Sequence, residues 1–365
     1  MTNQIVVFGA TGYTGGLVTE ALVRRGARPM LAGRGAERLA ALAQQFGGLD
    51  YRVADVTDPA SIRALVDQGD VLVTTVGPFE QFGHPVAQAA ADAGAHYLDS
   101  TGEVGFVRDV WERHDVRARA AGAVIAPAFG YDYVPGILAG ALAARAAGTA
   151  VHTIDVGYFA IGSLRNGLSQ GTRKTMAEGL ILPAPVWRDG QLVDETTAHQ
   201  VREFTVRGKR KNAFLVSGTE VLFLPSEVPG LRSVTVYNGW FPALSRGMQL
   251  VSATANAVAK LPRGRDLVNA ISARTVGAAG GPDAAERART LSHVVAVARD
   301  ERGTPVAEVH VEGPSPYALT GELMAWAAQR LASGAGRTPG VVGPVEAFGL
   351  DDLAAGCKEC GMVEV

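Results

Sequence analysis

Residues 5–15 of the chain read IVVFGATGYTG, an apolar stretch followed by glycines at positions 9, 12 and 15. Ile5–Phe8 has the composition of a buried β-strand, and Gly16–Arg25 has the pattern of a helix. A second apolar strand is expected over Arg28–Leu31, and it leads into Gly33 and Arg34. Strand, glycine-rich turn, helix and strand in this order predict a βαβ unit that binds a dinucleotide at the helix start.

Each glycine of this motif has its own expected task. Gly9 would form the tight turn, Gly12 would let the backbone approach the pyrophosphate, and Gly15 would let the helix pack against the strand. The positive end of the helix dipole would add to the attraction for phosphate. We therefore expect the loop to bind the cofactor through Gly9, Thr11, Gly12, Tyr13, Thr14 and Gly15.

Arg34 indicates which dinucleotide the site prefers. At the end of the second strand an NAD site carries an acidic residue on the ribose 2′-hydroxyl, whereas this chain carries a guanidinium. A guanidinium can bind a 2′-phosphate through two hydrogen bonds. The expected cofactor is NADP(H), although Arg34 could instead be a solvated residue at a helix entry. Asp55, at the end of the third expected strand, is a candidate acceptor for the adenine amino group.

Composition excludes several classes of function. The 365 residues are 47% hydrophobic and 19% charged with a net charge of −2, as in a globular protein with no general attraction for nucleic acid. The basic run at 207–211 lacks interleaved aromatic residues and is expected to be a solvated turn. No apolar run is long enough to span a bilayer, and we expect no leader peptide and a cytoplasmic location. Cys357 and Cys360 alone cannot complete a zinc site, so we expect reduced thiols and no metal.

Strands and helices alternate from residue 5 to about residue 128, which predicts an α/β Rossmann-type doubly wound parallel sheet. The rhythm then changes to hairpin signals, with turns at Asp189-Gly190, 208–212 and Arg302-Gly303 and an extended run at Val221–Leu224. A helix is also expected near Thr172–Leu180. We expect an NADP-binding domain over residues 1–134, an α+β substrate or dimerisation domain with a largely antiparallel sheet over 135–314, and a segment, 315–365, that returns to the first domain.

In a doubly wound sheet the ligand lies beyond the carboxyl ends of the strands, and this rule selects the candidate site. The fourth strand ends at Gly77, Pro78 and Phe79, whose backbone could lie along the ribose and nicotinamide. The fifth strand ends at 99–103, which contains Asp99 and a further candidate cofactor contact, Gly102. Tyr131 and Asp132 follow the sixth strand. Tyr131, Asp132 and Asp99 are the catalytic candidates, with Glu103 in support and His84 and Tyr158 as further polar candidates, although Asp99 and Glu103 could also be turn or helix-start residues.

A short-chain reductase needs a tyrosine with a lysine four residues later, because the ammonium group lowers the pKa of the phenol. None of the eight tyrosines has that lysine. The glycine motif alone is compatible with that class of enzyme, but its catalytic pair is missing.

Five segments together resemble the saccharopine dehydrogenase-like oxidoreductases, on the branch near the bacterial trans-acting enoyl reductases: Gly9–Gly15, Ala32–Arg34, Val76–Phe79, His96–Glu103 and Gly130–Pro135. Gly313–Tyr317 and Pro344–Gly349 also fit. The resemblance implies an NADP-binding domain completed by the C-terminal segment, a second domain with an open sheet, and a homodimer. The chain departs from the family at Tyr133, where serine is common, and at Phe79, where saccharopine reductases carry a tyrosine.

These observations predict an NADPH-dependent reductase that transfers hydride to an activated C=C or C=N bond of a small biosynthetic substrate. A protein that senses NADP(H) without catalysis is the alternative, although a sensor has little need of the second domain. A redox-neutral, NADP-dependent isomerase is a third possibility.

Overall fold

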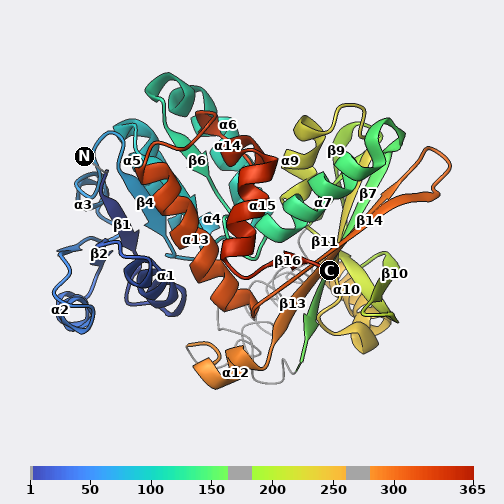
Figure 1. Cartoon of the computed structure of the whole chain (residues 1–365), viewed down its shortest axis with the longest axis horizontal. Helices are drawn as coiled ribbons and strands as arrows, with labels where there is room; N and C mark the ends of the chain where they lie inside the picture. Colours follow the sequence, from blue (N-terminus) through green and yellow to red (C-terminus); the bar gives the residue numbers. More distant parts are fainter. Residues whose placement is uncertain (1–2, 163–182, 260–279) are drawn as a thin grey trace. The chain divides into compact units, whose positions relative to one another are not determined.

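The computed structural model of the chain describes residues 3–162, 183–259 and 280–365 (Figure 1). The chain divides into two compact units. The first comprises Met1–Val134 and Pro316–Gly361, and the second comprises Pro135–Ser315 and Met362–Val365. Within the described ranges, no helix has both the length and the apolar character that crossing a membrane requires.

The first unit is built on a seven-stranded sheet in the order β15-β6-β5-β4-β1-β2-β3, and every pair in it is parallel. Its strands are β1 (Ile5–Phe8), β2 (Met30–Gly33), β3 (Tyr51–Val53), β4 (Val71–Thr74), β5 (His96–Asp99), β6 (Val124–Ala126) and β15 (Gly340–Val341). Its helices are α1 (Tyr13–Arg24), α2 (Ala36–Gln45), α3 (Pro59–Arg63), α4 (Phe79–Phe82), α5 (His84–Ala93), α6 (Val104–Ala121), α13 (Pro316–Ala332), α14 (Pro344–Phe348) and α15 (Leu350–Glu359). The expected doubly wound parallel sheet is confirmed.

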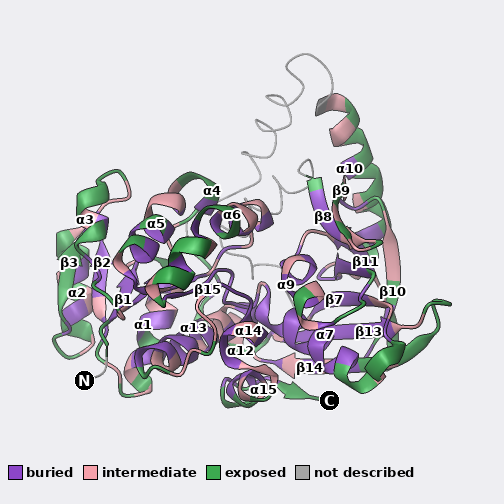
Figure 2. Cartoon of the chain, turned by 90° about the horizontal axis from the view of Figure 1, so that it is seen from above, coloured by how far each residue is buried: buried purple, intermediate pink, exposed green. Residues whose placement is uncertain are grey.

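The apolar strands lie where the sheet is most deeply covered. β1 and β4 are neighbours at the centre, and all their residues are buried, whereas the edge strand β3 is exposed (Figure 2). This agrees with the rule that a parallel strand covered on both faces is a continuous apolar run. α3 begins after Asp58, whose carboxylate accepts hydrogen bonds from the amides of Ala60 and Ser61.

The C-terminal helix α13 lies alongside α1 (Figure 1). The two backbones approach closely at Gly321, where an added Cβ would lie 3.1 Å from the Leu17 carbonyl oxygen. β15 then pairs with β6 and extends the first sheet at its edge. Segments from the two ends of the chain are therefore part of the same hydrophobic core.

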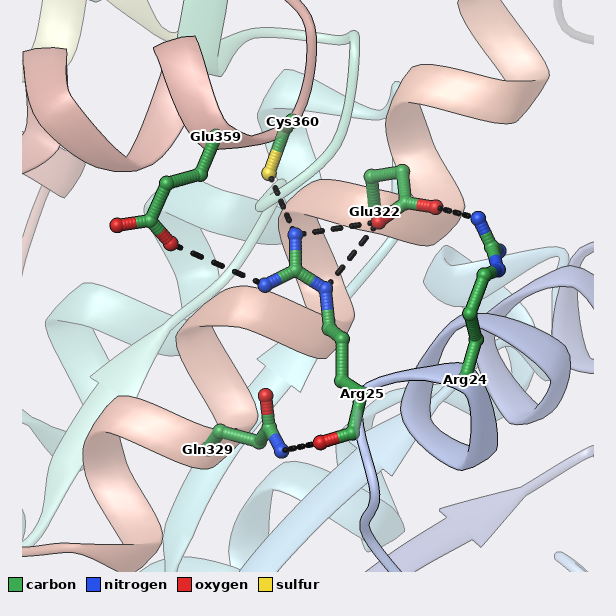
Figure 3. Close-up of polar contacts among 6 residues, drawn as sticks. All are labelled: Arg24, Arg25, Glu322, Gln329, Glu359 and Cys360. Carbon is green, nitrogen blue, oxygen red and sulfur yellow. Dashed lines mark hydrogen bonds and ion pairs between the residues drawn. The ribbon is translucent and has the colours of Figure 1, made fainter.

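A polar cluster joins the C-terminal ends of α1 and α15 to the side of α13 (Figure 3). The Arg25 guanidinium donates to Glu322 Oε2 at 3.2 Å and to the Cys360 sulfur at 3.4 Å, and its backbone carbonyl accepts from the Gln329 amide at 3.2 Å. Arg24 donates to the other Glu322 oxygen at 2.7 Å. The exposed Arg24 makes its ion pair with Glu322 worth roughly 0–1 kcal/mol, whereas the Arg25–Glu322 pair is partly buried. The twelve-residue α1 is roughly 18 Å long, so this cluster lies far from the glycine loop at the other end of the helix.

Cys357 and Cys360 are free, buried thiols at the end of α15. Burial raises the pKa of Cys360 to about 12 and raises that of Cys357 further above its usual value. Because the thiolate is the reactive form, we expect these buried cysteines to react slowly in the folded protein. The described residues contain no cluster of three or more metal-ligating side chains.

The second unit contains a mixed sheet in the order β10-β11-β12-β7-β13-β14-β16, with β8 attached to β12 and β9 attached to β8. β12 pairs parallel with β7, and the other pairs are antiparallel. The strands are β7 (Thr153–Ile161), β8 (Pro183–Arg188), β9 (Gln191–Thr196), β10 (Val201–Val206), β11 (Lys209–Val216), β12 (Ser233–Asn238), β13 (Leu291–Arg299), β14 (Pro305–Gly313) and β16 (Val363–Glu364). The described helices are α7 (Val134–Ala147), η1 (Gly148–Ala150), α9 (Glu220–Glu227), η2 (Pro242–Leu244), α10 (Ser245–Ala259) and α12 (Ala284–Ala288).

The three hairpins expected in this region are present as β8–β9, β10–β11 and β13–β14. One face of the sheet carries a hydrophobic cluster that includes Phe159, Phe204 and Tyr237. The basic run at 207–211 spans the β10–β11 turn, where Arg207 pairs with Glu312.

The prediction of an extended run at Val221–Leu224 is wrong, because these residues lie in α9. Val221 and Leu224 are both buried at a spacing of one helical turn, so the short run has helical rather than alternating burial. The helix expected near Thr172–Leu180 lies outside the described residues.

Candidate functional site

The order of strands in the first sheet defines one switch point. The chain moves from β1 to β2 and β3 on one side, then crosses to β4 and continues through β5 and β6 on the other. In such sheets ligands bind beyond the carboxyl ends of the strands on either side of the crossing. The loops that follow β1 and β4 are therefore the expected centre of the site.

The loop after β1 can only be formed by glycine at two positions. Gly9 has a φ of +88°, and a Cβ there would lie 2.8 Å from Thr75 Oγ1 and 2.9 Å from Val76 Cγ2, just after β4. A Cβ on Gly15 would lie 2.2 Å from the Gly9 carbonyl oxygen. Gly9 therefore forms the turn and Gly15 allows α1 to pack against it, which are the backbone roles that the motif predicts.

The N-terminus of α1 is suited to an anion. Its N-cap is the exposed Gly12, which supplies no side-chain cap, and its first turn contains no acidic residue. The loop has no room for a Cβ at Gly9 or Gly15, and it lies at the positive end of a twelve-residue helix. Both features are compatible with the pyrophosphate of a dinucleotide. Tyr13 covers one side of the helix start, with its ring 5.4 Å from that of Tyr317 on α13 in an edge-to-face arrangement.

Arg34 and Asp55 follow β2 and β3 at the other end of the expected cofactor path. Arg34 is exposed and forms no ion pair with any residue that the structure describes. Asp55 Oδ1 accepts hydrogen bonds from the backbone amide and the hydroxyl of Thr57, at 2.9 and 2.8 Å. These bonds, and to a smaller extent the charge of Arg34, lower the pKa of Asp55. One oxygen of Asp55 is thus committed to its own turn, while Arg34 remains available for a phosphate.

The side chain of Glu103 holds the loop after β4 in place. Its two carboxylate oxygens accept from the backbone amides of Phe79 and Glu80, at 2.9 and 2.8 Å. The carboxylate therefore caps α4, although Glu103 itself stands at the N-cap position of α6. The peptide bond between Gly77 and Pro78 is cis, and Gly77 is exposed at the switch point. Glu103 thus positions the loop in which Gly77, Pro78 and Phe79 are the candidate cofactor contacts.

Asp99 is fully buried at the end of β5. Its Oδ1 atom accepts from the amides of Thr101 and Ala128, at 2.9 and 2.8 Å, and its backbone carbonyl accepts from the Phe129 amide. Burial raises the pKa of this carboxyl group to about 6. These bonds join the loop after β5 to the segment after β6, so the observed geometry of Asp99 is that of a group that positions other residues.

The catalytic candidates Tyr131 and Asp132 lie in the segment Gly130–Tyr133, which is fixed from two directions. The Tyr131 amide donates to Thr320 Oγ1 on α13 at 3.0 Å, and the Tyr133 hydroxyl donates to the Gly102 carbonyl at 2.9 Å. The Tyr131 side chain is 2% exposed, whereas Asp132 is only partly buried. Burial raises the pKa of Asp132 to about 6. Gly102, Asp99 and the 130–133 segment thus form one connected group at the ends of β5 and β6.

Two further polar candidates have structural partners. Tyr158, in the second unit, is buried and donates to Glu220 at 2.6 Å, and it also accepts from the Gly136 amide. His84, in the first unit, packs edge-on against Phe106. Sequence reasoning did not identify Thr320 or Glu220. Thr320 lies 189 residues from its partner Tyr131, and no local pattern marks that contact.

Comparison with known proteins agrees with this geometry. Residues 5–126 match the family described as the saccharopine dehydrogenase NADP binding domain. A trans-acting enoyl reductase of Mycobacterium ulcerans is 39% identical over 138 residues, which are 36% of this chain and 33% of that protein. A Mycobacterium tuberculosis protein that carries the same name provisionally is 37% identical over 186 residues, or 48% of this chain and 44% of that protein. The matches therefore span less than half the length of these relatives.

Among solved structures, apo saccharopine dehydrogenase (L-Glu forming) from Saccharomyces cerevisiae superimposes with a TM-score of 0.62 over the whole of both chains, at 12% sequence identity. At this identity the likeness shows a shared fold. The match over β1 to β6 covers the glycine loop, Arg34 and the loop after β4. Residues 5–126 therefore match the NADP-binding domain of saccharopine dehydrogenases, and this match indicates NADP(H) binding.

Proposed function

We propose that the chain is an NADPH-dependent reductase, and that its substrate carries an activated C=C bond. The observation that carries this proposal is the position of Asp132, a partly buried carboxyl group in the Gly130–Tyr133 segment. The Tyr133 hydroxyl binds this segment to the Gly102 carbonyl, after the carboxyl end of β5. An enoyl substrate is favoured over an imine because the relatives with 37–41% identity are named enoyl reductases. Reduction of a C=N bond is the second candidate.

NADPH, when bound, would supply the hydride. The tasks left to the chain are to hold the cofactor, exclude water and deliver a proton. The glycine loop and the α1 N-terminus would hold the pyrophosphate, and Arg34 would hold the 2′-phosphate. Asp132, with its pKa raised to about 6, is present in both protonation states near neutral pH and could give its proton to the carbon or nitrogen that becomes basic on reduction.

The test uses purified protein, NADPH and three probes: crotonyl-CoA, 2-cyclohexenone and 1-pyrroline. The expected result is a steady loss of NADPH fluorescence with an enoyl probe. Asp132→Asn should then lower kcat at least tenfold and change the Kd of NADPH less than threefold, because the carboxyl group acts on substrate. In the wild type kcat should fall as the pH rises above about 6, and the variant should lose this dependence.

The alternatives give different results in the same experiment. Tight NADPH binding without turnover of any probe would favour a redox sensor. Conversion of a probe to an isomer without net NADPH consumption would favour a redox-neutral isomerase. Equal losses of NADPH affinity and kcat in Asp132→Asn would remove Asp132 from the proposed proton transfer. The substrate-binding and dimerisation roles of the second unit remain predictions, and analytical ultracentrifugation tests the homodimer.

A further inference from the structure

We propose that Thr320, on the C-terminal helix α13, is a positioning residue that sets the place of the Gly130–Tyr133 segment relative to the nucleotide loop. This inference rests on the proposed function and deepens it, because it names what holds Asp132 in place. Thr320 itself would touch neither substrate nor cofactor.

The hydrogen bonds of Thr320 fix the direction of its hydroxyl group. Oγ1 donates its proton to the Pro316 carbonyl at 2.8 Å, one turn earlier on α13. A lone pair of the same oxygen therefore remains for the Tyr131 amide, which donates to it at 3.0 Å. A hydroxyl group whose proton is already used can serve as an acceptor of fixed orientation.

The methyl group of Thr320 also packs against this segment, next to Gly130. A Cβ built on Gly130 would lie 2.9 Å from Thr320 Cγ2, so the backbone of the 130–131 segment passes directly against this side chain. Both branches of one threonine thus contact the segment that carries the catalytic candidates. A serine would keep the hydrogen bonds, and a valine would keep the shape.

The same helix is anchored to α1, which begins at the nucleotide loop. Tyr317, three residues before Thr320, packs edge-on against Tyr13 at the start of α1. A Cβ built on Gly321, the next residue after Thr320, would lie 3.1–3.2 Å from the backbone of Leu17. Further along, Glu322 accepts from Arg24 and Arg25 at the end of α1 (Figure 3). α13 therefore lies along α1 in a fixed register and carries the acceptor for Tyr131.

The consequence concerns the distance between the nicotinamide and the proton donor. In catalysis a misplacement of about 1 Å can lower the rate by about a hundredfold, although binding is little affected. α13 contributes the contacts that connect the two parts of the site within the first unit. Loss of the Thr320 acceptor should therefore lower kcat and leave the affinity for NADPH nearly unchanged.

The experiment compares Thr320→Val, which removes the acceptor and keeps the shape, with Thr320→Ser, which keeps the acceptor. Thr254→Val is the matched control, because Thr254 makes the same bond one turn back on α10, to the Leu250 carbonyl at 2.9 Å. The readouts are hydrogen–deuterium exchange in a peptide that covers residues 129–134, the Kd of NADPH from fluorescence, and kcat with crotonyl-CoA. If Thr320→Val does not fold, Thr320→Ala removes the acceptor without the added methyl group.

For Thr320→Val we expect exchange at least tenfold faster in the 129–134 peptide, a Kd of NADPH within twofold of the wild type, and a kcat lower by about 10- to 100-fold. Thr254→Val should match the wild type in all three, and Thr320→Ser, which keeps the acceptor but lacks the methyl group, should stay much closer to the wild type than Thr320→Val does. Unchanged exchange in Thr320→Val, or equal impairment of the valine and serine variants, would overturn the inference. If the wild type turns over no probe, the proposed function fails, while the exchange measurement still decides whether Thr320 holds the segment.

Discussion

Replacement of Asp99 by asparagine separates a positioning role from a catalytic one, because the structure predicts how its effect changes with pH. The backbone amides of Thr101 and Ala128 both donate hydrogen bonds to the same oxygen of Asp99, Oδ1. The other oxygen is buried and interacts with the buried Tyr97 hydroxyl, although the two do not meet the geometry of a regular hydrogen bond. An asparagine can keep Oδ1 as the acceptor and place its amide nitrogen at the position of the other oxygen, without a charge in the core.

The magnitude follows from the pKa of the buried carboxyl group, which burial raises from 3.8 to about 6. The folded protein therefore binds this proton more tightly than the unfolded chain does. The free energy of unfolding falls as the pH rises from about 4 to about 6, and the loss is complete above that window. A pKa difference of this size corresponds to about 3 kcal/mol. The asparagine side chain cannot ionise, so Asp99→Asn should gain about 3 kcal/mol relative to the wild type between pH 4 and pH 8.

The assay is urea unfolding of both proteins from pH 4 to pH 8, followed by hydrogen–deuterium exchange in a peptide that covers β4 and β5. The quantity to compare is the change with pH of the difference between the two unfolding free energies, since any fixed cost of the substitution cancels in it. A difference that does not vary with pH, or that moves in favour of the wild type as the pH rises, would refute the reasoning. A stabilised variant with wild-type kcat would assign Asp99 a positioning role, and a stabilised but inactive one would support the catalytic prediction.

Three further predictions concern other residues. Arg34→Gln should weaken NADPH binding by roughly 10- to 100-fold, since a charge-assisted contact to the 2′-phosphate is lost, and leave NADH binding nearly unchanged in a fluorescence titration; equal weakening of both would argue against that contact. Glu103→Gln should lower the free energy of unfolding by about 1–3 kcal/mol in urea titrations, because a neutral amide can accept only one of the two backbone amides of α4, and an unchanged value would show that the cap is unimportant. Cys357 and Cys360 should react with Ellman's reagent only after unfolding; rapid labelling of native protein would contradict their burial.

Much of the first unit could be predicted from the sequence because its signals are local. Ile5–Phe8 is uniformly apolar and becomes a fully buried central strand. The need for glycine at position 15 arises from the Gly9 carbonyl, six residues earlier, so one short motif contains both partners of the contact. A feature is predicted reliably when the residues that cause it lie close together in the sequence. The run Val221–Leu224 lacks this property, since four apolar residues fit a strand or one helical turn equally well.

The partners of the candidate site residues could not be predicted, because they are distant along the chain. Glu103 stands at the start of a helix, which suggested a residue that stabilises that helix, yet its carboxylate caps the loop 24 residues earlier. Asp99 accepts from an amide 29 residues later. Asp99 and Glu103 lie at or just after the carboxyl end of β5. The residues next to them in the sequence do not show whether either carboxylate holds a loop or contacts a substrate.

Burial and hydrogen bonding distinguish Asp99 from Asp132, although the pKa values of the two carboxyl groups do not. Asp99 and Asp132 both have a pKa raised to about 6, and burial is the first cause for each. Asp99, however, is fully buried, and its Oδ1 atom accepts from two backbone amides that join the loop after β5 to the segment after β6. Asp132 keeps part of its surface exposed, and its neighbours Tyr131 and Tyr133 carry the bonds that fix the segment. Since proton transfer requires a group that can meet its partner at hydrogen-bond distance, we expect Asp132 to be the proton donor and Asp99 to hold the loops around it.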